Sequence, residues 1–126
     1  MLSEGVKINI NKLINSLIKL QLNIKVIHWT TENYNTHKIT DELYNEILDF
    51  TDRIVETYQG IVGNLPPSKF DLQFSSISEK DIVQYLYDVI NNIMTNVYID
   101  LPEDMKAIMD EMLEKLRVKI YLLRMN

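Results

Sequence analysis

Long stretches without helix breakers dominate this sequence and favour a chain of long helices. Its 126 residues include only three glycines and three prolines, and most of these lie between residues 60 and 67. Between the breaks, apolar residues recur at spacings of three and four, which is the period of an amphipathic α-helix. The pattern predicts four helices, over about residues 6–31, 36–61, 78–98 and 101–124, with Thr36 capping the second.

Each predicted helix carries one apolar stripe that would face a shared core. The helical period places the members of each stripe on one side of the helix. The stripes consist of Ile10, Leu13, Ile14, Leu17, Leu20, Ile24 and Ile27 in the first helix; Ile39, Leu43, Ile47, Phe50, Ile54, Tyr58 and Ile61 in the second; Ile82, Tyr85, Leu86, Val89, Ile93 and Val97 in the third; and Met105, Ile108, Met109, Met112, Leu116, Ile120 and Leu123 in the fourth.

The one long connection lies between the second and third helices, over about residues 62–77, where a pair of prolines cannot continue a helix. Capping signals that begin at Ser78 and Asp100 open the last two helices, with Pro102 in the first turn of the fourth. Two short connections and a long one predict an all-α chain, a single four-helix domain over residues 1–126. Ferritin-like bundles have such a crossover between the second and third helices.

The composition argues against several classes of function. A net charge of -5 makes DNA an unlikely partner, because nucleic-acid binding needs a basic surface. The absence of cysteine excludes disulfides, zinc–thiolate sites and cysteine nucleophiles, which leaves two histidines as the nitrogen ligands for a metal. No apolar run approaches the roughly 20 residues that span a bilayer, and the first ten residues do not resemble a signal peptide. A cytoplasmic protein is therefore expected.

Four residues in the second predicted helix are of the type that binds metals. His37 and Asp41 are four residues apart, and so are Asp52 and Glu56. With His37 at zero and about 100° per residue, the three acids fall at roughly 40°, 60° and 100°. All four share one stripe, opposite the core positions, so they are expected to point away from the bundle.

That outward stripe also carries apolar residues, Tyr44, Leu48 and Val55. Such a mixture indicates a second buried surface, which another subunit would cover. Asp41 and Asp52 are roughly 16 Å apart along a helix, so one chain cannot bring both to one ion. Two antiparallel copies about a two-fold axis would form two equivalent sites, with imidazole and carboxylate ligands suited to Fe(II), Mn(II) or Zn(II).

The dipeptide His28-Trp29 ends the first predicted helix, and a short turn would carry His28 back over His37. With His37, Asp41, Asp52 and Glu56 at these spacings, the sequence resembles the Dps miniferritins. These ferritin-like proteins form hollow dodecamers, oxidise Fe(II) with peroxide and store the ferric product. The amino-acid sequence of this segment resembles even more closely that of small Dps-like proteins of bacteriophages, whose function is unassigned.

The resemblance implies an iron site between subunits. His28, His37 and Asp41 would come from one copy, and Asp52 and Glu56 from its two-fold mate. It also implies that Trp29 lies beside the iron as an oxidisable side chain, the candidate catalytic residue of a ferroxidase. The alternative is a helical dimer or interaction protein of the phage type, without iron oxidation or cage assembly.

Overall fold

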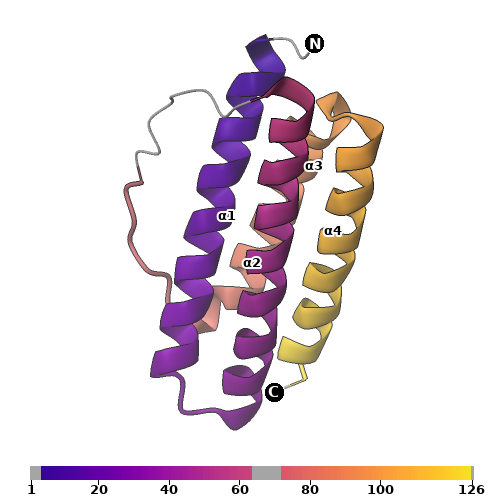
Figure 1. The fold of residues 1–126 in the computed structure, drawn as a ribbon. Coiled ribbons are helices and arrows are strands. Elements are labelled where there is room, and N and C mark those ends of the chain that lie inside the picture. The colour runs from indigo at the N-terminus through magenta and orange to yellow at the C-terminus, as the bar shows by residue number, and fades with distance from the viewer. Residues whose placement is uncertain (1–3, 64–71, 126) are drawn as a thin grey trace.

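Four long α-helices make up most of the chain (Figure 1). The computed structural model describes residues 4–63 and 72–125. The helices are α1 (Glu4–Thr30), α2 (Tyr34–Val62), α3 (Ile82–Asn96) and α4 (Glu103–Leu123); the 3₁₀ turns η1 (Glu79–Asp81) and η2 (Tyr98–Asp100) flank α3. The described residues contain no strand, so the prediction of an all-α chain with four helices is confirmed.

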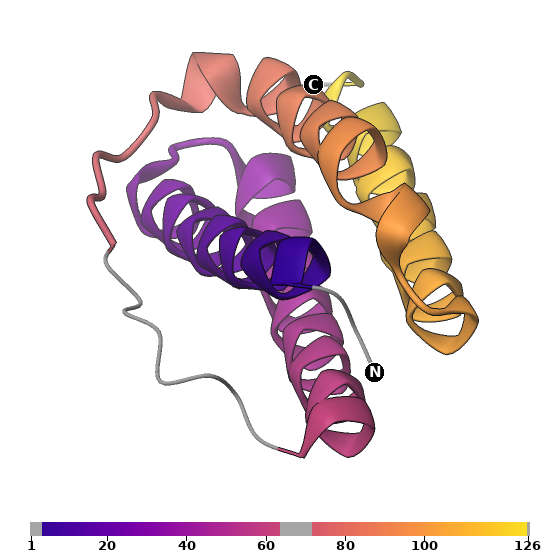
Figure 2. The same ribbon diagram turned by 90° about the horizontal axis from the view of Figure 1, so that it is seen from above.

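The helices lie side by side, with their axes parallel or antiparallel to one another (Figure 1). α1 and α4 run one way, whereas α2 and α3 run the other. α2 packs against both α1 and α4 along its length, and α1 approaches α3 only locally, which Figure 2 shows from above. Half of the predicted connection between α2 and α3, residues 64–71, lies outside the described residues. In the part of the chain that the structure describes, no helix is long and apolar enough to cross a membrane.

The apolar stripes predicted from the sequence form the core almost without exception. Ile24, Leu43, Leu86 and Leu116 are fully buried, with one or more such residues on every helix. Two predicted core residues deviate. Ile61 is 40% exposed because it lies in the last turn of α2, where the bundle ends, and Tyr85 is only partly buried.

The ends of the helices differ from the prediction. Asn33 caps α2 instead of Thr36, because Asn33 has the extended backbone of a capping residue and its side chain accepts from the amide of Thr36 at 3.0 Å. The helix therefore begins two residues early. At the start of α3, Ser78 makes no capping bond and η1 intervenes; Pro102 precedes α4 instead of lying in its first turn.

Candidate metal site

The tight turn between α1 and α2 brings the two histidines into contact. His28 lies in the last turn of α1 and His37 at the beginning of α2, with only residues 31–33 between the helices. The two imidazole rings stack, with centroids 3.9 Å apart and planes inclined by 18°. The prediction that the turn carries His28 back over His37 is confirmed.

Each histidine is fixed by the other's backbone. Nδ1 of His28 lies 2.8 Å from the carbonyl oxygen of His37, and Nδ1 of His37 lies 2.8 Å from the carbonyl oxygen of His28. Because a carbonyl oxygen can only accept, each Nδ1 carries the hydrogen. In the neutral rings both Nε2 atoms then hold a lone pair, which is the state in which an imidazole binds a metal. We call this reciprocal pair the histidine clasp.

Asp41 adds a carboxylate to the histidine clasp. Its Oδ1 lies 4.0 Å from Nε2 of His28, whose side chain is 12% exposed, against 54% for Asp41. Two ligand atoms that share an ion at bond lengths of about 2.1 Å cannot lie farther apart than about 4.2 Å. The pair is already within that limit, and a small rotation of the exposed Asp41 would bring it to the usual spacing. His28 and Asp41 are therefore close enough to share a divalent ion.

Asp52 and Glu56 do not join this cluster. Both side chains are exposed, about three and four turns beyond Asp41 along α2, as the predicted outward orientation requires. Neither has an ion-pair partner among the described residues. Over residues 4–63 and 72–125, no three histidine, aspartate or glutamate side chains converge closely enough to hold an ion. One chain thus holds two separate groups of candidate ligands: the histidine clasp with Asp41, and the pair Asp52 and Glu56.

Trp29 lies at the edge of the clasp and is 68% exposed. The ammonium of Lys25 lies 5.8 Å from its ring centroid and 4.5 Å from that of Tyr44 on α2. These distances are within the range of cation–π attraction. This contact could not be predicted from the sequence, because nothing in the helical period shows which aromatic rings flank a lysine from the neighbouring helix.

Thr40 is a residue of this region that sequence reasoning missed. It is fully buried beneath the clasp, its hydroxyl donates to the carbonyl of Thr36 at 2.7 Å, and its Oγ1 lies 3.4 Å from Nδ1 of His28. A hydroxyl with its hydrogen so engaged presents a lone pair to the ring and favours the same tautomer. The only signal in the sequence is a threonine one turn after His37.

A second polar cluster joins α2 to α4. Lys119 is almost buried, and its ammonium lies 2.7 Å from Glu42 and 3.4 Å from Glu46. The hydrogen bond from Lys119 lowers the pKa of Glu42. Burial alone would lower the pKa of Lys119, but the two carboxylates outweigh it and raise that pKa. All charges here are paired within the chain, so this cluster stabilises the fold.

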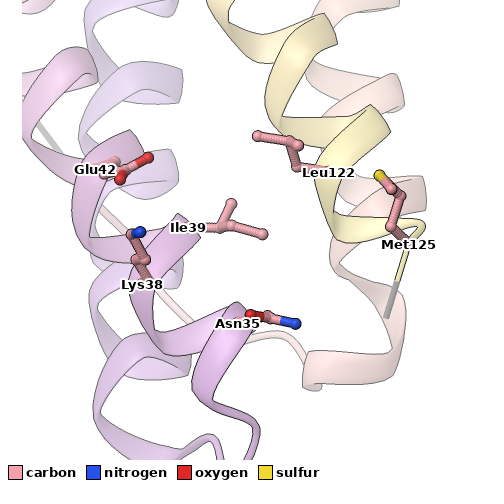
Figure 3. Close-up of a pocket in the computed structure, with 6 residues that line it drawn as sticks. All are labelled: Asn35, Lys38, Ile39, Glu42, Leu122 and Met125. Atoms are coloured by element: carbon pink, nitrogen blue, oxygen red, sulfur yellow. The ribbon is translucent and has the colours of Figure 1, made fainter.

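A pocket of about 370 Å³ opens beside this cluster, between the start of α2 and the end of α4 (Figure 3). Its floor is apolar and its rim carries charged and amide groups. None of the five expected metal ligands contributes to it. The lining residues are Asn35, Lys38, Ile39, Glu42, Leu122 and Met125.

A family model matches residues 28–123, under the description "Family of unknown function (DUF5856)". The chain belongs to this family. The DUF5856 match begins at His28 and therefore covers the histidine clasp, Asp41, Asp52 and Glu56, together with α2, α3 and α4. No curated protein and no solved structure matches the chain.

Proposed function

We propose that this protein binds and oxidises ferrous iron at a site shared by two copies of the chain, in the manner of the Dps miniferritins. One copy would contribute His28, His37 and Asp41, and the other Asp52 and Glu56. The histidine clasp carries the proposal, because it engages both Nδ1 atoms with backbone carbonyl oxygens, leaves Nε2 available in each neutral ring, and holds Nε2 of His28 4.0 Å from the Asp41 carboxylate. Mn(II) and Zn(II) prefer similar ligands and are alternative occupants.

The arrangement of the helices supports a ferritin-like bundle. α2 and α3 run in the same direction in Figure 1, so the connection between them has to return along the length of the bundle, as a crossover does. Two copies paired through the outward faces of α1 and α2 would form the basic dimer. A dodecamer, as in Dps proteins, would then require further contacts between dimers.

The chain's own residues would perform three tasks. The imidazoles and carboxylates bind Fe(II) as substrate in a mixed N/O shell that leaves room for an oxidant. The carboxylates also stabilise the greater charge of the ferric product. Peroxide, or dioxygen, would take up the released electrons together with protons. Trp29 would lie beside the iron, as an oxidisable side chain that can supply an electron to the oxidant when Fe(II) does not supply enough.

A second function is favoured by the same clasp. Its two hydrogen bonds join the end of α1 to the start of α2 and are complete without a metal. A clasp of this kind would also serve a helical interaction protein of the phage type, which pairs but does not oxidise iron. This alternative predicts a small oligomer that neither binds Fe(II) nor gains thermal stability from Mn(II) or Zn(II).

Anaerobic titration with Fe(II), followed by addition of peroxide, distinguishes iron oxidation from the function of an interaction protein. We expect ferric absorbance in the near ultraviolet to rise until the sites are filled, and His37→Ala and Glu56→Gln to abolish this site-limited phase. Glu114→Gln is the matched control for Glu56→Gln, because Glu114 is also exposed and is not one of the five proposed ligands. Equal oxidation rates in wild type and His37→Ala would refute the proposal.

A further inference from the structure

The outward face of α1 and α2 combines apolar surface with unpaired negative charge. Leu22 and Trp29 are seven residues apart on α1, and Leu48 lies on the outward stripe of α2. These three side chains are between 39% and 68% exposed. Lys25 reaches from α1 to the ring of Tyr44, so the two stripes adjoin. An apolar face of this kind favours pairing.

The charges on the same face oppose pairing. Asp41, Asp52 and Glu56 are exposed, and the latter two have no ion-pair partner among the described residues. In an antiparallel pair of copies, each site would collect three carboxylates. Lys25 supplies one compensating positive charge nearby. Without a cation, the two copies would therefore repel each other at both sites, in a chain whose net charge is already -5.

We propose that metal binding controls whether two copies of this chain associate. This inference rests on the proposed function, since it assigns the same five ligands. A divalent ion held by the histidine clasp and Asp41 of one copy attracts Asp52 and Glu56 of the other and cancels most of the local charge. The ion binds the dimer more tightly than the monomer, so by linkage it strengthens the dimer by the same factor. A coupling of about tenfold at each of two sites strengthens dimerisation about 100-fold.

Sedimentation velocity and native mass spectrometry of the full chain test this coupling. Zn(II) is the redox-silent metal probe, and EDTA provides the metal-free condition. We expect monomer to predominate in EDTA and dimer with two bound ions in Zn(II), with dimer dissociation constants that differ by about 100-fold. Asp52→Asn/Glu56→Gln removes the repulsion and the ligands together. It should pair more tightly than wild type in EDTA and respond little to Zn(II).

Asp88→Asn/Glu114→Gln is the control, because it removes two negative charges from α3 and α4 instead. Its dimer dissociation constant should still fall on addition of Zn(II) as in wild type. A wild-type dissociation constant that is equal in Zn(II) and EDTA would overturn the coupling. If Zn(II) is found on monomer and dimer alike in that case, the histidine clasp and Asp41 bind the metal within one chain, and only the contribution of Asp52 and Glu56 from a second copy is refuted. If neither species carries Zn(II), the shared site is refuted as well.

Discussion

Replacement of Lys119 by methionine tests how the charged cluster between α2 and α4 stabilises the bundle. Methionine has nearly the length of lysine and keeps the apolar packing of its stem. What it removes is the ammonium that lies 2.7 Å from Glu42 and 3.4 Å from Glu46. Both glutamates are then left without their main partner, and the free energy of unfolding should fall.

The expected loss follows from the exposure of the glutamates. Removal of one partner of a fully buried ion pair costs about 3–5 kcal/mol, because a charge is left without solvent. Here the side chain of Glu42 is 47% exposed and that of Glu46 24%, so water can replace much of the lost interaction. We therefore expect Lys119→Met to lose about 1–2 kcal/mol at neutral pH.

The loss should depend on pH. Because Lys119 lowers the pKa of Glu42 in the folded chain, the pair stabilises the fold above the ordinary glutamate pKa of 4.5. This stability is lost as the pH falls through the lowered pKa. The difference between wild type and Lys119→Met should therefore shrink as the pH is lowered from 7 to about 3.

Urea unfolding followed by circular dichroism at both pH values measures these differences. Lys115→Met is the matched control, because Lys115 is half-exposed and lies 3.6 Å from Glu46. It should lose less than about 0.5 kcal/mol. Equal losses for the two variants at neutral pH, or a Lys119→Met deficit that does not change with pH, would refute the reasoning.

Three further predictions concern the helix cap, the core and the exposed tryptophan. Asn33→Ala should lower the free energy of unfolding in urea by about 1 kcal/mol, and no loss would contradict its capping role. Leu43→Ala should lose about 2–5 kcal/mol because it leaves a cavity, whereas Ile61→Ala, 40% exposed, should lose far less; similar losses would contradict the burial pattern. Fluorescence of Trp29, the single tryptophan, should shift to shorter wavelength when Zn(II) drives pairing, and an unchanged spectrum would place Trp29 outside the interface.

The fold was largely predictable because it follows from one physical regularity. A helix that must bury one side repeats apolar residues every three or four positions, so Leu17, Ile47 and Met109 could be assigned to the core from spacing alone. The caps were less predictable. Asn33 and Thr36 are both capable of capping, and the choice depends on which residue adopts the extended backbone.

The helix face that carries the candidate ligands was predictable, but the geometry of the histidine clasp was not. The spacings of His37, Asp41, Asp52 and Glu56 gave the outward stripe, which the structure confirms. The reciprocal hydrogen bonds between His28 and His37 depend on the conformation of a three-residue turn, which has no periodic signal. Lys119, whose neighbour Ile120 was assigned to the core, escaped notice as a buried charge because the apolar period of α4 does not show that Glu42 and Glu46 of α2 lie against it.

The shared metal site is tested most directly by mixing two defective chains. One chain carries His28→Ala/His37→Ala and the other Asp52→Asn/Glu56→Gln, so neither can build a complete site with its own kind. In a mixed dimer, one of the two sites receives intact histidines from one chain and intact carboxylates from the other. We predict that mixing restores about half of the wild-type Zn(II) content per dimer, measured by native mass spectrometry on the mixed species. Mixed dimers without bound Zn(II) would contradict a site built from two copies.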